Sequence, residues 1–421
     1  MTSGPRSIGF REFVVLVAAM MAIQAIAVDG MLPALPAIAN TLGITDANQI
    51  QWIVTAYVGG MGIGQLFWGA VSDRFGRRPV LLWALALYVV AVLLTGWSTR
   101  FVALLVWRFV HGLAAAGVVV ARSVIRDLYS GRHMARVMSL TFIVFLMVPV
   151  IAPSLGQMIL LLAPWRYIFV FFGLFAAVVW AWAALRLPET LHAEYRLVVT
   201  RSHLMAAVRR VVGDRISLYY SLASTVMFGS LLAYIGMVQQ IFAGIFRRPG
   251  LMPAVFALCA ASMGVASFFN SRIVERVGMR LISHAALLVF LAVTLLHTAV
   301  ALSGHESMWL FVVLQAATMA CFSLAVSNFG AMAMEPLGSI AGIGASLQGF
   351  LSTAGGALVG AAIGWEYNGT LVPLAAGGLV TGVAALLCVL MAERGRLFRP
   401  QHVVDGQHAG GDRRIPEPGM H

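Results

Sequence analysis

The sequence predicts an all-α membrane protein with twelve transmembrane helices in two six-helix halves, and three observations support this fold class. Of the 421 residues, 60% are hydrophobic and only 10% are charged, whereas a soluble domain carries about 25% charged residues. The apolar residues gather in twelve runs of about the 20 residues that cross a bilayer. A loop sequence also recurs once in each half of the chain. A soluble fold could not cover so much apolar surface, so we expect the bilayer to be its solvent.

The apolar runs form two sets of six predicted spans. The first set covers residues 13–38, 53–71, 80–97, 101–122, 137–164 and 167–185. The second set covers residues 216–242, 251–270, 281–302, 308–334, 340–365 and 371–391. We therefore predict an N-terminal half over 1–187, a basic cytoplasmic linker over 188–215 and a C-terminal half over 216–393. Residues 394–421 are polar and rich in glycine and proline, so we expect a disordered cytoplasmic tail.

The arginines predict which way the spans face. All 28 basic residues are arginine, and the net charge is +12. With the N-terminus in the cytoplasm, four arginines lie in outer loops and one lies inside a span: Arg100, Arg166, Arg247 and Arg248, and then Arg108. All the others lie at or beyond cytoplasmic ends, where membrane proteins concentrate positive charge. Orientation thus explains the charge better than nucleic-acid binding does, and both termini are expected in the cytoplasm.

An internal repeat supports the division into halves. The loop after the second span and the loop after the eighth are related by a constant shift of 202 residues, which matches Asp73 to Glu275, Arg74 to Arg276, Gly76 to Gly278 and Arg78 to Arg280. Both copies lie between the second and third spans of their own half. Two parallel halves of this kind are the architecture of one large class of transporters.

The first copy of this loop also carries a known pattern. Gly69-x-x-x-Asp73-Arg74-x-Gly76-Arg77-Arg78 resembles the cytoplasmic loop signature of the major facilitator superfamily, and the resemblance covers residues 13–391. It implies a gating latch made of seven residues: Gly69, Asp73, Arg74, Gly76, Arg77, Arg78 and, as a partner for Arg74 or Arg77, Asp127. The residue types fit this role, because glycines permit close approach and a tight turn while arginines bind carboxylates and the anionic inner leaflet. The alternative is a loop that only anchors the topology.

Asp29 is the only carboxylate well inside a predicted span. Burying it there costs a few kcal/mol, so such a group usually faces the bundle interior and has a function. Burial disfavours the charged form of a carboxylate and a nearby cation favours it. A group balanced between these effects can load and release a proton. The alternative is a structural aspartate that caps the backbone freed by Pro33 and Pro36.

Arg108 and His111 in the fourth span are the predicted partners of Asp29. Arg108 lies seven residues inside its span and Asp29 nine residues inside its own, which are depths of roughly 10 and 13 Å from the outer face. Arg108-Phe-Val-His111-Gly112 resembles the Arg-x-x-Gln-Gly motif that the superfamily associates with proton coupling. His111 stands where glutamine is usual, either as a hydrogen-bonding substitute or as a second titrating group.

The fifth span resembles the antiporter motif Gly-Pro-x-x-Gly-Gly through Pro149, Pro153 and Gly156. Ala152 and Gln157 replace two of its glycines, which weakens the prediction of export without removing it. Segments of spans one, ten and eleven resemble the bicyclomycin and chloramphenicol resistance subfamily of drug–proton antiporters. Polar residues within the spans are candidates for the substrate cavity, or equally for contacts that hold helices together: Gln24, Tyr234, Gln239, Asn328 and Gln348.

These observations predict a secondary transporter that exchanges protons for hydrophobic or amphipathic small molecules, outward, by alternating access. The resemblance places it in a bacterial inner membrane as a monomer without cofactor or metal, driven by the proton gradient. One alternative in the same fold is a uniporter or proton symporter that takes up a metabolite. A remote alternative is a membrane enzyme or sensor. An enzyme would need clustered His, Asp or Glu residues, and the ten histidines are scattered in the sequence.

Overall fold

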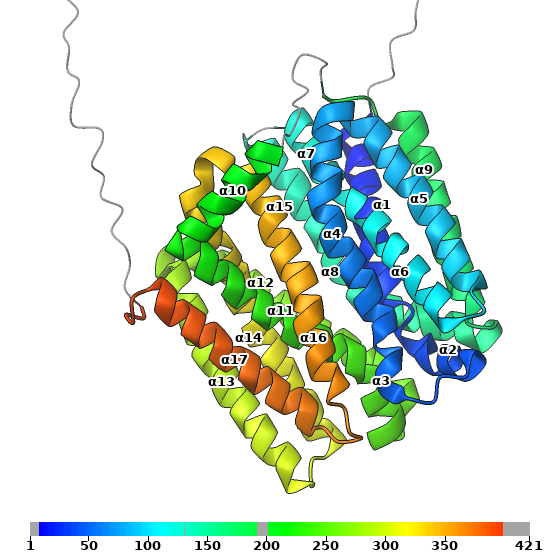
Figure 1. The fold of residues 1–421 in the computed structure, drawn as a ribbon, viewed down its shortest axis with the longest axis vertical. Coiled ribbons are helices and arrows are strands. Elements are labelled where there is room, and N and C mark those ends of the chain that lie inside the picture. Colours follow the sequence, from blue (N-terminus) through cyan, green and yellow to red (C-terminus); the bar gives the residue numbers. More distant parts are fainter. Residues whose placement is uncertain (1–7, 130, 192–200, 399–421) are drawn as a thin grey trace, which may run out of the picture.

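The computed structural model describes residues 8–129, 131–191 and 201–398, and within these ranges every regular element is a helix (Figure 1). The first group comprises α1 (Phe10–Asp29), α2 (Leu35–Leu42), α3 (Ala47–Ile50), α4 (Trp52–Phe75), α5 (Arg77–Trp97), α6 (Phe101–Ala115), α7 (Val119–Leu128), α8 (Gly131–Leu162) and α9 (Arg166–Arg186). The second comprises α10 (Arg201–Gly213), α11 (Arg215–Gln240), α12 (Met252–Val277), α13 (Met279–Ser303), α14 (Met308–Met334), α15 (Ala341–Phe350), α16 (Gly356–Trp365) and α17 (Val372–Ala392). Figure 1 shows the two groups on opposite sides of the molecule.

Ten helical segments in the described residues are long and apolar enough to cross a membrane. They match ten of the twelve predicted spans, so the chain is a multi-pass membrane protein, but the count of twelve remains a prediction. The second predicted span corresponds to α4, whose glycines and Gln65 lower its hydropathy. The fifth corresponds to α8, in which only the segment Met147–Leu162 is described as apolar. The predicted linker contains a helix, α10, and the predicted tail from residue 399 onward lies outside the described residues.

Proline and glycine set the helix boundaries that matter for the site. The first span is interrupted directly after Asp29, where Gly30 ends α1 and a short 3-10 turn, Leu32–Ala34, leads into α2. Pro33 lies within that turn. Proline has no backbone N–H, so it cannot donate the hydrogen bond that would continue an α-helix through this position. Gly76 and Gly278, the matched glycines of the repeat, have φ angles of 103° and 89°. This backbone conformation favours glycine, and in both copies it separates one helix from the next by a single residue.

The ends of the helices define two faces of the bundle. We call the face where α1 begins and α17 ends the terminal face, and the opposite face the far face. The main apolar core runs through α1, α4, α5, α6 and α9 and includes the far ends of α11, α12 and α14, whereas a second core joins the terminal ends of α11, α13, α14 and α17. The two groups of helices therefore share the main core toward the far face, and toward the terminal face Leu66 of α4 packs against a smaller cluster of Val211, Leu337 and Leu347.

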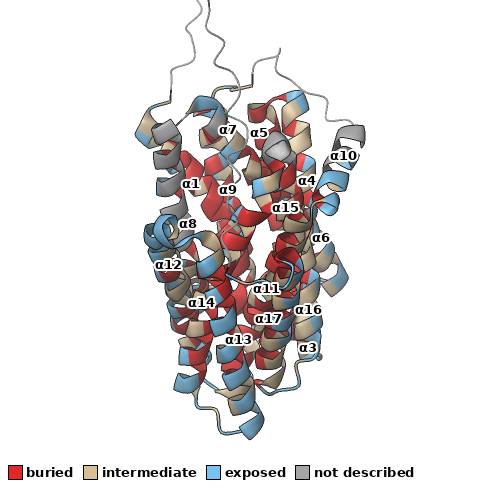
Figure 2. Ribbon diagram, turned by 90° about the vertical axis from the view of Figure 1, so that its left-hand side faces the viewer, coloured by how far each residue is buried: buried red, intermediate tan, exposed pale blue. Residues whose placement is uncertain are grey.

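Large apolar side chains cover the outside of the bundle. Figure 2 shows buried residues along its inside and exposed ones along its outer surface. Leu162 is 83% exposed and Leu185 82%. Exposing so continuous an apolar surface to water would be unfavourable, whereas lipid tails solvate it. Trp97 and Trp309, both exposed at far ends of helices, suit the interfacial region, which tryptophan prefers.

Candidate substrate cavity and its charged residues

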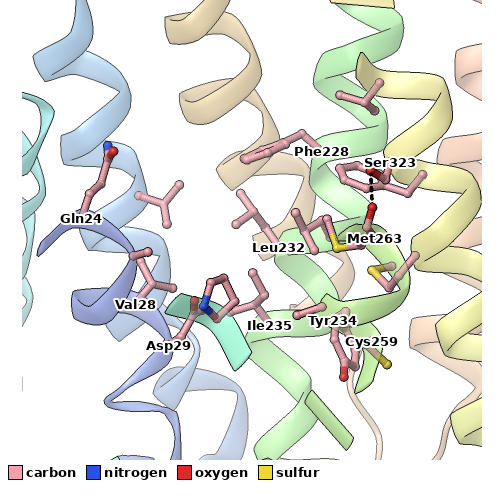
Figure 3. Close-up of a pocket in the computed structure, with 18 of the residues that line it drawn as sticks. Gln24, Val28, Asp29, Phe228, Leu232, Tyr234, Ile235, Cys259, Met263 and Ser323 are labelled. Atoms are coloured by element: carbon pink, nitrogen blue, oxygen red, sulfur yellow. Dashed lines mark hydrogen bonds between the residues drawn. The ribbon is translucent and has the colours of Figure 1, made fainter. Parts of the chain in front are cut away.

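A cavity of about 440 Å³ lies between the two groups of helices. Figure 3 shows its wall, with α1 on one side and α11 and α12 on the other. Most of the lining side chains are apolar, among them Val28, Phe228, Leu232 and Met263. This size and character suit a drug-sized, largely hydrophobic ligand.

The cavity opens toward the terminal face. At its far end the lining residues Asp29, Tyr234 and Phe256 are buried, whereas Arg122 and Ser327 toward the terminal end are exposed. Exposure thus increases along the cavity from the far face to the terminal face.

Contacts between the two groups of helices close the far face. The amide of Asn48 donates to the carbonyl of Trp365 at 2.8 Å. The buried amide of Gln51 donates to the carbonyl of Gly364 at 3.0 Å and to the side-chain oxygen of Gln240 at 3.1 Å. These hydrogen bonds join α3 and the start of α4 to α11 and the end of α16, and so hold the two groups of helices together at the far face.

Asp29 lies in the cavity wall without a charged partner. Its residue is 5% exposed, and no hydrogen bond or ion pair formed by described residues reaches its carboxylate. The capping role considered above is therefore not seen in this structure. An unpaired carboxylate in apolar surroundings is costly in its charged form, which makes a proton its natural partner.

Arg108 is fully buried and does not form the predicted ion pair with Asp29. Instead its Nη2 donates to the carbonyl of Ala27 and its Nε to the carbonyl of Ile53, both at 3.2 Å. Its guanidinium lies 4.4 Å from the ring centre of Tyr57. The donors of Arg108 are used by backbone carbonyls of α1 and α4, so Arg108 holds the segment that carries Asp29 rather than the carboxylate itself.

His111 completes an aromatic cluster behind α1. Its Nδ1 lies 3.2 Å from Nη1 of Arg108. Because a guanidinium can only donate, this nitrogen accepts, and the ring hydrogen lies on Nε2, which has no partner among the described residues. The rings of Tyr57 and Tyr88 meet the imidazole edge-on, and the Tyr88 hydroxyl donates to the carbonyl of Ile23. This geometry favours the hydrogen-bonding interpretation of His111.

The antiporter motif of the fifth span packs directly on the break after Asp29. A Cβ at Gly156 would collide with the carbonyl of Gly30, so only glycine allows α8 to approach α1 this closely. Pro149, about two turns earlier in α8, lines the cavity, and Pro153 is buried between them. The motif thus lies beside the acidic residue rather than at a distance from it.

The predicted cavity residues divide into three sets. Gln24 and Tyr234 line the cavity. Asn328 donates to Asn270 at 2.9 Å and Gln348 to the carbonyl of Gly330 at 3.2 Å, so both hold helices together. Gln239 is buried outside the lining, and its Oε1 has no partner in the described residues. The sequence alone does not show whether a polar residue in a span faces the cavity or a neighbouring helix.

The first copy of the repeated loop forms a network on the terminal face. Arg77 contacts the carboxylate of Asp73, donates through Nε to Asp127 at 3.1 Å, and donates its backbone N–H to Glu189 at 2.9 Å. Asp127 therefore pairs with Arg77 and not with Arg74. This network joins α4, α5, α7 and the segment after α9.

The other residues of that loop have separate contacts. Arg74 lies over the ring of Phe75, and Arg78 donates to the carbonyl of Ala184 at 2.6 Å. Gly69 faces α15, but a Cβ there would lie 3.6 Å from the Ser346 hydroxyl, which is ordinary contact. The close approach expected at Gly69 is thus not as tight as at Gly156.

The second copy forms a different network on the same face. Arg280 donates to Glu393 at 2.8 Å and to Glu335 at 3.4 Å. The hydroxyl of Tyr220 donates to the same oxygen of Glu393 at 2.7 Å and lies 3.0 Å from Nε2 of His284. Arg280 and Tyr220 thereby tie α11, α13 and the end of α17 together.

Sequence reasoning missed several polar groups. Arg122 in the cavity wall, Glu189 beside Arg77 and the buried contact of His297 with Glu306, 2.9 Å apart, were not anticipated. His297 and Glu306 are nine residues apart across a loop, so no helical spacing indicated their contact. In the described part of the chain, no group of three or more His, Cys, Asp or Glu side chains is placed to hold a metal ion.

Comparison with known proteins agrees with this architecture. The chain is similar to the xylose transporter XylE from E. coli in a partially occluded inward-open conformation, with a TM-score of 0.73 at 10% identity over 93% of this chain and 99% of that one. It is also similar to the human organic anion transporter MFSD10, with a TM-score of 0.60 at 18% identity over 91% of this chain and 99% of that one. At such identities the likeness concerns the fold only.

Sequence relatives are more informative. An uncharacterized MFS-type transporter, YdgK of Bacillus subtilis, is 30% identical over 86% of this chain and 90% of its own length. A bicyclomycin resistance protein homolog of Haemophilus influenzae is 30% identical over 86% and 91%, and the multidrug resistance protein MdtL of Klebsiella pneumoniae is 26% identical over 85% and 88%. The family model of the Major Facilitator Superfamily matches residues 16–361. The chain is therefore a transporter of the major facilitator superfamily, in the branch that contains the bicyclomycin and multidrug resistance proteins.

Proposed function

We propose that this protein is a proton-coupled antiporter that exports hydrophobic or amphipathic small molecules from a bacterial cytoplasm. The observation that carries the proposal is Asp29, whose carboxylate has no partner among the described residues and which is 5% exposed in the wall of an apolar cavity. The names of the relatives, bicyclomycin and multidrug resistance proteins, support drug efflux. The proton gradient supplies the energy, and no cofactor takes part.

The surroundings of Asp29 support a coupling role. Arg108 grips the carbonyl of Ala27, two residues before the acid, and the Tyr57 hydroxyl donates to the carbonyl of Gln24 at 3.1 Å. Gly156 presses on Gly30 immediately after it. The end of α1 is thus held from two sides while its carboxylate faces the cavity. A change of charge at Asp29 alters the free energy of burying its side chain or exposing it to water. This difference biases the two groups of helices toward one opening or the other.

The side to which the cavity opens fits export. Since the arginines predict that the terminal face is cytoplasmic, the cavity of this structure faces the cytoplasm and takes up substrate there. The far-face contacts of Gln51 with Gly364 and Gln240 must break before substrate leaves on the other side. Proton binding from outside at Asp29 then returns the protein to the inward-open state.

Replacement of Asp29 by asparagine tests the coupling. We expect Asp29→Asn to reduce pH-driven efflux of chloramphenicol and bicyclomycin to the level of protein-free vesicles, because an amide cannot carry the proton. The measurement is uptake into inverted membrane vesicles with an imposed pH gradient. Asp46→Asn is the matched control, since Asp46 is an exposed helix cap on the far face and asparagine caps equally well.

The outcomes separate the candidate functions. Full pH-driven transport by Asp29→Asn would show that the coupling group is elsewhere. Movement of the probes in the same direction as the protons would make the protein a symporter, and movement independent of the gradient would make it a uniporter. Wild-type protein that moves neither probe under any gradient would remove the drug-efflux assignment.

A further inference from the structure

Arg122 is a second charged residue in the cavity wall and has no assigned role. It belongs to α7 and is exposed to the cavity near its terminal end. No hydrogen bond or ion pair formed by the described residues reaches its guanidinium. Arg77, Arg186 and Arg280 near the same face are all paired with carboxylates. Arg122 differs from these arginines in lining the cavity without a carboxylate partner among the described residues.

An unpaired guanidinium in an apolar cavity is suited to bind an anion. It offers five N–H donors in a planar fork that matches a carboxylate with two hydrogen bonds. The acid nearest along the chain, Asp127, is occupied, because it accepts from Arg77 and from the Thr190 hydroxyl. A ligand that brings its own acceptor oxygens would therefore satisfy Arg122 as no described residue does.

The apolar wall next to Arg122 can hold the rest of such a ligand. Phe228, Met263 and Phe322 line the same cavity, and the only other charged residue among its described lining is Asp29. The hydroxyls of Ser267 and Ser323 bond to each other at 2.7 Å. The wall thus offers an apolar surface with one cationic end and one acidic end.

The two charges are far enough apart to act separately. Arg108 touches the carbonyl of Ala27 and so marks the level of Asp29. Arg122 follows Arg108 by 14 residues in the same span, which is about 20 Å along the helix. At that distance, with an effective dielectric constant near 20, a unit charge at one end changes the affinity at the other by only about fourfold. An anion at Arg122 can thus be bound whether or not Asp29 carries a proton.

We propose that Arg122 is a subsite that recognises the anionic head, a carboxylate foremost, of amphipathic substrates whose apolar body lies along the cavity. This inference rests on the proposed transport function and narrows its substrate class. A neutral substrate with a nitro or carbonyl group uses the same donors, but without the gain that a charged acceptor brings.

A pair of probes that differ only in charge tests the subsite. The probes are anthracene-9-carboxylate and its methyl ester, measured by equilibrium dialysis against the full chain in nanodiscs, with empty nanodiscs subtracted. We expect wild-type protein to bind the carboxylate more tightly than the ester. Arg122→Gln should weaken the carboxylate about tenfold and the ester less than about twofold, since one charge-assisted contact is lost. Arg122→Lys should restore part of the loss.

Arg210→Gln is the matched control, because Arg210 is exposed on α10 outside the cavity. Equal weakening of both probes by Arg122→Gln would assign Arg122 a structural role and overturn the proposal. Equal binding of both probes by wild-type protein would also overturn it, even if the variant does not fold. The assay uses no proton gradient, so its result is independent of the Asp29→Asn experiment.

Discussion

The two copies of the repeated loop hold the terminal face by different means. In the first copy Arg77 joins Asp73 and Asp127, whose side chains are 35% and 19% exposed. In the second copy Arg280 joins Glu393, whose side chain is 4% exposed. In the first network a buried arginine thus joins two acids that are partly open to water, whereas in the second Arg280 joins the buried Glu393 and the 39% exposed Glu335.

The difference arises from a shift of the cation by one residue. The repeat relates Arg77 to Met279 and Arg78 to Arg280. The second copy therefore keeps an arginine at the position of Arg78 and has none at the position of Arg77. An acid that is partly exposed to water loses its partner at little cost, but leaving a buried charge without its partner costs several kcal/mol. We infer that the first copy is the network that can open and close during transport, and that the second is a fixed clamp.

Removal of Arg280 should have the largest effect on stability. Among the described residues, Arg280→Gln leaves the buried Glu393 with the Tyr220 hydroxyl as its remaining side-chain partner, so we expect a loss of about 3 kcal/mol. Thermal unfolding of the purified protein measures it. Arg276→Gln, an exposed change four residues away, is the control and should be nearly neutral. An Arg280→Gln protein as stable as that control would show that the second copy is not a clamp.

Removal of Arg77 should cost less stability but more transport. Its partners Asp73 and Asp127 are partly solvated, so Arg77→Gln should lose about 1 kcal/mol. Transport should nevertheless fall by more than this loss of folded protein explains, because the network that opens and closes is gone. Efflux divided by the amount of folded protein measures this. The comparison fails if Arg77→Gln unfolds the protein as readily as Arg280→Gln does.

Sequence reasoning reached the local features of the molecule and missed those that depend on distant partners. The turn at Gly76 and the place of Asp29 within the first span follow from residue types and spacing, whereas that span was predicted as one run over 13–38 and is interrupted after Asp29. Glu393 lies 113 residues from Arg280, so no local pattern signalled that pair. Arg108 was predicted to bind a carboxylate, but backbone carbonyls satisfy a buried guanidinium too, and sequence does not distinguish the two.

Restoring the missing cation should have the smallest effect and sharpens the comparison further. Met279→Arg places an arginine at the position equivalent to Arg77, beside the exposed Glu275. The shift that matches the two loops takes Asp127 to Phe329, which is fully buried, so the new arginine finds no second acid. We expect a change in stability within about 0.5 kcal/mol and no rescue of Arg280→Gln in the double variant. Rescue would mean that an arginine at position 279 can replace the one at position 280. The difference between the two copies would then lie in their acids and not in the position of the arginine.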